Sequence, residues 1–256
     1  MYEPVFTPPP RSWREWWSAV REFTAGWYGI AAGEVSGYHR QADRLGRHLG
    51  VSLSPSIHEW FAFAIDLQQA GIFDRAFGGD RFTVGWDESI EAMYLLTLGE
   101  KDVCWGVQQE HLADDDPPVD VWHLAGSGLR SWRWSHHHTP AISQFALQHL
   151  IHRLVPAGGV HYAFMPVSPE NAGLLRGAEL IRDAGLTSID LGAEMLIEGE
   201  DLVVLAGKSP WTPPEVTDIT VHAVIGPSRT GSIPPLLLDL APGLKDASRR
   251  LPRPAR

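Results

Sequence analysis

The sequence predicts an α+β fold: a mostly antiparallel sheet of about five to six strands, helices packed on one face, and N-terminal helices before it. Apolar residues recur at helical spacing from Arg11 to Ala70, and short alternating runs separated by turn residues follow from Arg81 to Trp134. A strong amphipathic helix then begins near Thr139. Consecutive short strands favour an antiparallel meander, and the apolar faces of the helices need a sheet to bury against.

Three helices are predicted in the first part of the chain. The range 11–28 has Trp and Phe at helical spacing after a possible N-cap, Ser12, and the range 36–49 stops before Gly50. Ser54-Pro55-Ser56 opens the third helix, over 54–70, because serine is a favoured N-cap and proline fits the first helical position.

The pattern then changes to short strands. Strands are predicted over 81–86, 92–98, 103–107, 119–123 and 129–134, and Gly99-Glu100-Lys101-Asp102 is a natural hairpin tip. Between the third and fourth of them, Asp114 to Asp116 meet Pro117-Pro118, which holds the chain extended in an acidic turn.

The remaining elements are a helix, a strand, a short helix and a hairpin. The helix spans 139–155, the strand 160–165 and the short helix 172–184, and the hairpin pairs 195–197 with 202–205. These elements give a proline-rich disordered lead over 1–10, a single domain over 11–207 and a largely irregular basic tail over 208–256. We expect poor order before Arg11 and after Lys245.

Apolar spacing also predicts the core. The side chains expected to be buried are those of Trp60, Phe61, Ile65, Trp105, Phe145 and Leu150. Cys104, the single cysteine of the chain, lies in an apolar run and is expected to be a small buried residue rather than a reactive thiol. A lone cysteine allows no internal disulfide, and no secretory signal or membrane-spanning run is visible, so the sequence predicts a cytoplasmic protein.

The net charge of −10 is unevenly distributed. The range 87–120 carries ten acidic residues against one basic residue, whereas the range 208–256 has an excess of basic residues. An acidic body repels nucleic acid and favours a cationic protein partner through electrostatic steering, although acidic residues also serve solubility alone.

The residues that could carry catalysis are few. His136-His137-His138 cannot all bind one metal ion from a strand, because consecutive side chains point to alternate faces. A metal-assisted hydrolase would therefore need His149 or His161 in addition. Gly126-Ser127-Gly128 lacks the second glycine spacing of a nucleophile elbow, and no phosphate-binding glycine loop is present.

Several motifs together resemble the Smi1/Knr4 family, or SUKH superfamily. They are the Ser54-Pro55 helix entry with Glu59-Trp60-Phe61, the Trp105-Gly106 pair, the Asp116-Pro117-Pro118-Val119 turn and the Ser143-Gln144-Phe145 helix start, within roughly 45–205. The resemblance implies an α+β fold without catalytic residues. Bacterial members of the family act as immunity proteins that neutralise toxins, and others act as regulatory scaffolds. The Trp-rich leading helices and the basic tail depart from the family pattern.

The sequence therefore predicts a non-enzymatic protein-binding domain, an immunity-type protein that grips a cationic toxin domain through an acidic surface. It implies no cofactor, metal, nucleic acid or membrane partner. We expect Trp105 and Trp122 to be structural, and the partner-facing residues to be Glu110, Asp114, Asp115, Asp116 and Asp120. The hydrolase that uses His136 to His138, and a regulatory scaffold, are the alternatives.

Overall fold

The chain divides into two compact units, residues 10–153 and residues 1–9 with 154–256. The computed structural model describes residues 5–6, 8–29, 39–71, 85–98, 103–125, 131–153, 161–167, 186–192, 194–199, 202–207, 219–225, 235 and 239. Its elements confirm the predicted α+β class with an antiparallel sheet of five strands. The predicted single domain over 11–207 differs from this division, because the chain leaves the first unit at Arg153.

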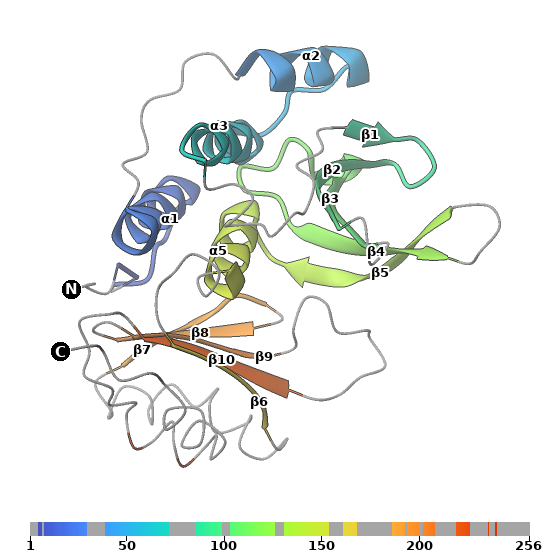
Figure 1. The fold of residues 1–256 in the computed structure, drawn as a ribbon. Helices are drawn as coiled ribbons and strands as arrows, with labels where there is room; N and C mark the ends of the chain where they lie inside the picture. The colour runs from blue at the N-terminus through green and yellow to red at the C-terminus, as the bar shows by residue number, and fades with distance from the viewer. Residues whose placement is uncertain are drawn as a thin grey trace. The chain divides into compact units, whose positions relative to one another are not determined.

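Helices α1 (Trp13–Tyr28), α2 (His39–Leu49), α3 (Pro55–Gln69) and α5 (Ile142–Arg153) belong to the first unit. The predicted caps are present, since the Ser12 and Ser54 hydroxyls accept the backbone N–H groups of Glu15 and Ile57. Helix α1 ends at Gly29, whose φ of 69° is a conformation that glycine adopts without strain. Figure 1 shows α1, α3 and α5 together on one side of the sheet.

The first sheet is the predicted meander. Strands β1 (Gly85–Asp87), β2 (Ala92–Leu98), β3 (Val103–Gln108), β4 (Val119–Ala125) and β5 (Ser131–Thr139) pair in sequence order, and each pair is antiparallel. The one-turn 3₁₀ helix η1 (Gln109–His111) follows β3. The turn 88–91 and the loop 109–118 therefore lie at the same end of the sheet, as the hydrogen bond from Gln109 N to Glu91 O (2.9 Å) shows directly.

The core of the first unit lies between the helices and the sheet. All six side chains predicted to be buried are at most 7% exposed. The ring of Phe145 on α5 lies 5.5 Å from that of Trp60 on α3 and 6.2 Å from that of Trp105 on β3, so one aromatic residue joins three elements.

The Trp-rich helix α1 is an integral part of this core. Trp17 Nε1 donates to Ser56 Oγ on α3 (3.0 Å), and Tyr28 Oη donates to Leu150 O on α5 (2.7 Å). Arg21 bridges Glu59 (2.8 Å) and the buried Asp66 (3.0 Å), both on α3. These contacts bind the leading helix to the two helices of the predicted domain.

The second unit contains an antiparallel sheet in the order β6-β10-β9-β8-β7. Its strands are β6 (His161–Val167), β7 (Thr187–Asp190), β8 (Glu194–Gly199), β9 (Leu202–Gly207) and β10 (Ile219–Ile225). The β8–β9 hairpin and the strand β6 were predicted, but β7 was missed. The prediction of an irregular tail is wrong for 219–225, because β10 pairs with both β6 and β9 inside the sheet. The predicted helix over 172–184 lies outside the described residues.

The N-terminal lead also differs from the prediction of disorder. Phe6 is 0% exposed, and the backbone N–H groups of Val5 and Phe6 donate to the carboxylate of Glu198 on β8, at 3.1 and 2.9 Å. A single apolar side chain and one buried carboxylate order these two residues, although prolines surround them in the sequence.

None of the helices in the described ranges is long and apolar enough to span a membrane.

Candidate functional site: the acidic end of the first sheet

The loop 109–118 is joined to the start of α3 by backbone hydrogen bonds. Ser54 N donates to Leu112 O (2.8 Å), and Ser56 N donates to Asp115 O (3.3 Å), so the loop lies on the first turn of α3. Within the loop, Asp114 N donates to His111 O (3.0 Å) and His111 Nδ1 lies 2.7 Å from Asp114 Oδ2. The loop is held in one conformation by partners from distant parts of the sequence.

Asp116 faces inward, which corrects its assignment as a partner-facing residue. Its carboxylate accepts Ser143 N (3.3 Å) and Ser143 Oγ (2.5 Å) at the start of α5, and it also hydrogen bonds with Ser56. Burial raises the pKa of Asp116, against the lowering effect of these hydrogen bonds. A carboxylate beside the N–H groups of a helix start is stabilised there, so Asp116 joins the loop to α3 and α5.

Asp120 is 1% exposed, and this too corrects the prediction. Its Oδ1 lies 2.5 Å from Nδ1 of His137, which is itself exposed, and its Oδ2 accepts a hydrogen bond from Gln108. On β4 the side chain of Asp120 points away from the helices, but the longer side chains of β3 and β5 cover it. Asp120 therefore cannot meet a partner directly.

The other three predicted residues are exposed. Glu110 and Asp114 have 74% and 54% of their side-chain area exposed, and Asp115 is also exposed. Two further exposed acids that sequence reasoning did not single out, Glu88 and Glu91, lie at the same end of the sheet. We call Glu88, Glu91, Glu110, Asp114 and Asp115 the acidic rim. The predicted order of the strands already implied this grouping. In a meander, every second turn lies at the same end of the sheet, so the turns 88–91 and 109–118 are neighbours.

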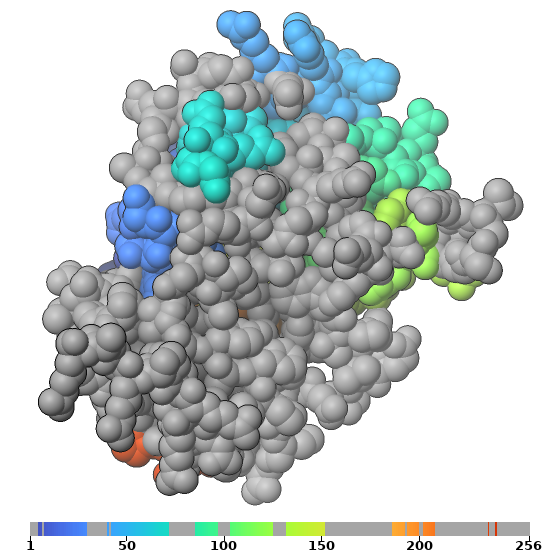
Figure 2. All heavy atoms as spheres, in the orientation of Figure 1, coloured from blue at the N-terminus to red at the C-terminus, as the bar shows by residue number. Residues whose placement is uncertain are grey.

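The acidic rim continues into the outer face of the sheet, the face opposite the helices. Trp134 on β5 is 52% exposed, and its ring lies 5.4 Å from that of His137, which covers Asp120. The same sheet contains a small cluster of the buried residues Ala92, Cys104 and Trp122. The partly buried side chains of Ile90, Tyr94 and Trp132 pack against this cluster. In Figure 2, atoms of the β1–β2 segment (green) and of β5 (yellow-green) reach the surface on the same face.

Trp122 and Cys104 are buried in this cluster, in agreement with a structural tryptophan and an inert thiol. Burial raises the pKa of the Cys104 thiol, and the charge of Asp87 raises it further. Partial burial acts to raise the pKa of Asp87, but the hydrogen bonds that its carboxylate accepts from Ser89 and Tyr94 together outweigh it and lower the pKa.

The three consecutive histidines, His136 to His138, lie on β5. The strand sends them to different faces: the His138 ring contacts Phe145 and His149 of α5, whereas the His137 ring lies over Asp120 on the outer face. His138 and His149 are both buried, and their ring centroids are 6.4 Å apart. Among the described residues no group of three or more His, Cys, Asp or Glu side chains is arranged to hold a metal ion.

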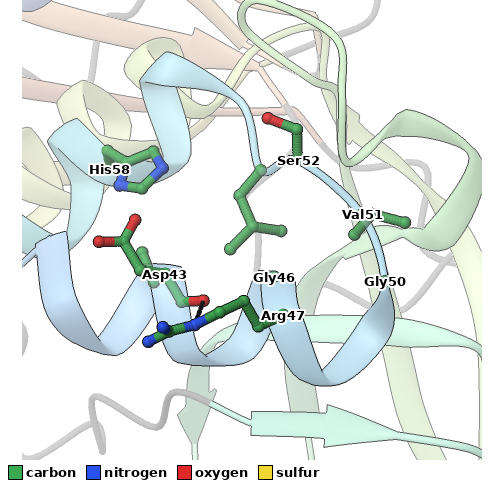
Figure 3. Close-up of a pocket in the computed structure, with 9 residues that line it drawn as sticks. Asp43, Gly46, Arg47, Gly50, Val51, Ser52 and His58 are labelled. Carbon is green, nitrogen blue, oxygen red and sulfur yellow. Dashed lines mark hydrogen bonds between the residues drawn. The ribbon is translucent and has the colours of Figure 1, made fainter.

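A separate pocket of about 650 Å³ lies between α2, the segment 50–53 and α3. Figure 3 shows the Asp43 carboxylate and the His58 ring pointing toward each other there, with Arg47 on the same turn of α2. Arg47 Nε donates to Asp43 O (3.2 Å). Since Asp43 and Arg47 are exposed, water screens their charges, and we assign no chemistry to this pocket.

Comparison of the chain with models of protein families, with curated proteins and with solved structures finds no match.

Proposed function

We propose that this chain is a non-enzymatic binding protein of the Smi1/Knr4 type that grips a basic protein through the acidic rim of its first unit. Following the family resemblance, the partner is a cationic toxin domain and the chain is its immunity-type inhibitor. The observation that carries the proposal is the convergence of exposed carboxylates from two turns, 88–91 and 109–118, at one end of the sheet. Neither turn contains Lys or Arg.

The rigidity of the loop supports this function. Because hydrogen bonds to α3 and α5 already hold residues 109–118, binding does not have to order them, and less conformational entropy is lost on association. Like charges held close together in the free protein also repel, and a basic partner surface relieves that repulsion.

The motifs behind the family resemblance meet in this one region. Ser54 and Ser56 at the α3 entry, the Asp116 turn and Ser143 at the α5 start are hydrogen bonded around the loop. Trp105 then packs against Phe145 of the same α5 motif. Motifs that are far apart in sequence thus share one role, which is to hold the loop 109–118 against α3 and α5. This shared role supports the proposal.

The test compares two charge-matched variants as immobilised baits in a lysate of the source organism. The rim variant is Glu110→Gln with Asp115→Asn, which leaves the Asp114–His111 contact intact. The control variant is Glu22→Gln with Asp43→Asn, two exposed acids on α1 and α2. We expect a basic protein that the wild type and the control capture and that the rim variant captures less.

Association rates measured with the purified partner then test whether the charges of the acidic rim steer binding. At low salt the rim variant should associate roughly 3–10-fold more slowly than the control, and this difference should vanish at high salt, because ions screen exposed charges. Trp134→Ala should instead raise the dissociation rate about 10-fold or more, since half-exposed tryptophans dominate many interfaces. Equal association rates for rim and control variants across the salt series would exclude the acidic rim as the docking surface.

A further inference from the structure

The second unit holds the N-terminal residues in a way that is typical of peptide recognition. Val5 N and Phe6 N each donate to a different oxygen of the Glu198 carboxylate, and the Phe6 side chain is completely buried. Hydrogen bonds from main-chain N–H groups and a buried aromatic anchor are both used by proteins that bind peptides.

Val5 and Phe6 contact the second unit through the Glu198 carboxylate and the buried Phe6 ring, and they are far from its strands in sequence. Residues 10–153 separate it from the rest of the unit, and neither Val5 nor Phe6 lies in a strand of the sheet. Pro4, Pro8, Pro9 and Pro10 flank it, and prolines favour an extended backbone before any contact forms. Proline lacks an N–H group, so Val5 and Phe6 supply donors inside a segment that otherwise has few.

Glu198 is built into the unit rather than placed on its surface. It is 1% exposed and lies on β8 opposite Thr187 of β7 and Val203 of β9. A buried carboxylate requires hydrogen-bond donors, and two of them come from the N-terminal segment. Glu198 therefore acts as an acceptor for backbone N–H groups rather than as a solvated charge.

We propose that Glu198 and the interior position of Phe6 form a peptide-binding site that the chain's own Val5 and Phe6 fill in cis. Its ligand class is a bent segment with one aromatic residue and two consecutive N–H groups that point the same way, as Val5 and Phe6 do. The bound segment is exchangeable, so a peptide of the same sequence supplied in trans replaces it once the covalent link is cut. This site is separate from the acidic rim and does not depend on the function proposed for it.

The experiment uses the full chain with a recognition sequence for a site-specific protease inserted between Pro9 and Pro10. Pro8 and Pro9 are exposed, so the protease can reach the site. After cleavage, gel filtration and mass spectrometry measure how much of the released segment stays with the protein. A fluorescently labelled peptide of residues 1–9 is then titrated into the cleaved chain from which the released segment has been washed, and fluorescence polarisation records its binding.

We expect saturable binding to the cleaved chain and none to the uncleaved chain, whose site is filled. Replacing Phe6 by Ala in the peptide should weaken binding about 30-fold or more. Glu198→Gln in the protein should weaken it about 10-fold, because a charged acceptor is lost. The matched control is Glu194→Gln, a buried glutamate on the same strand, which should change the affinity less than about 2-fold.

Three results would overturn the proposal. The first is a cleaved chain that keeps its circular dichroism spectrum but binds no labelled peptide. The second is an equal loss of affinity in Glu194→Gln and Glu198→Gln, which would indicate general destabilisation of the unit. The third is unfolding of the second unit on cleavage, which would make residues 1–9 a part of its fold rather than a ligand.

Discussion

Gly106 shows how one residue decides the shape of the first sheet. A Cβ atom at this position would lie 2.4 Å from the Met93 carbonyl oxygen and 3.3 Å from the Trp122 ring. The glycine therefore lets the β2 backbone approach β3 closely and leaves room for the Trp122 ring on the outer face. The Trp105-Gly106 pair thus combines a core aromatic residue on the inner face with an empty position on the outer face.

Gly106→Ala should destabilise the first unit by about 3 kcal/mol, because the obstructing atom belongs to the backbone and cannot rotate away. Gly85→Ala is the matched control, since its Cβ would make an ordinary contact of 3.5 Å with Tyr94. Urea unfolding followed by tryptophan fluorescence measures both. Similar midpoints for the two variants would show that the sheet adapts to a side chain at 106.

At the scale of elements, a hydrogen-bonded network joins α1, α3, the loop 109–118 and α5. Trp17 donates to Ser56, Ser56 hydrogen bonds with Asp116, and Asp116 accepts from Ser143. A variant that replaces Asp114, Asp115 and Asp116 together would therefore combine a surface effect with loss of this network. Tests of binding should leave Asp116 in place.

Asp116→Asn should cost about 1–2 kcal/mol, and the cost should depend on pH. Burial raises the folded-state pKa of Asp116 above its usual 3.8, so the folded chain binds this proton more tightly than the unfolded chain. The contribution is complete below pH 3.8 and declines as the pH rises through the folded-state pKa. The difference between wild type and variant should thus be larger at about pH 3.5 than at about pH 6.5.

Urea unfolding of both proteins across this pH range measures the difference. Asp115→Asn serves as the control, because its exposed side chain should contribute within about 0.5 kcal/mol at either pH. A difference that grows with rising pH would contradict the inward-facing, partly buried carboxyl.

The contact between α1 and α3 gives a second prediction at this scale. Burial raises the pKa of Asp66, and the Arg21 guanidinium acts against it. Arg21→Met would leave the buried Asp66 without that cation and should destabilise the first unit by roughly 2–3 kcal/mol. Asp66→Asn in the same background should recover part of the loss.

Arg44→Met is the matched control for Arg21→Met. Arg44 is an exposed arginine on α2, and its replacement should change stability by less than about 0.5 kcal/mol. Equal thermal unfolding midpoints for the two arginine variants would mean that the ion pairs of Arg21 do not help to hold α1 on α3.

For the whole molecule, the division into two units predicts how fragments behave. Residues 10–153 contain the first sheet, its four described helices and the core around Phe145, whereas the second unit needs both ends of the chain. Phe6 and the two N–H donors to Glu198 would be missing from a fragment of residues 154–256.

The fragment 10–153 should therefore fold alone and unfold cooperatively in urea. The fragment 154–256 should be less stable alone than in the full chain, because it leaves a buried position empty and a buried carboxylate short of two donors. Circular dichroism of each fragment measures this. A non-cooperative 10–153 fragment would show that the first unit depends on the rest of the chain.

The sequence alone determined the elements whose signals are local. Serine caps, an N1 proline, apolar spacing and alternation predicted α1, α3, α5 and the meander, and the six expected core residues are buried. It also placed Glu110, Asp114 and Asp115 on an exposed acidic turn. These features depend on residues within a few positions of one another, so the local sequence is enough to predict them.

Only the tertiary structure decided which acids face solvent and where the ends of the chain lie. Asp116, Asp120 and Glu198 are acidic in sequence, but their hydrogen-bond partners are Ser143, His137 and the N–H groups of Val5 and Phe6, at distant positions. Strand β10 lies in a proline-rich region of the sequence, and its assignment as a strand depends on its pairing with β6 and β9. The burial of a residue depends on the neighbours that pack around it. Many of these neighbours are distant in sequence, so local sequence patterns do not reveal them.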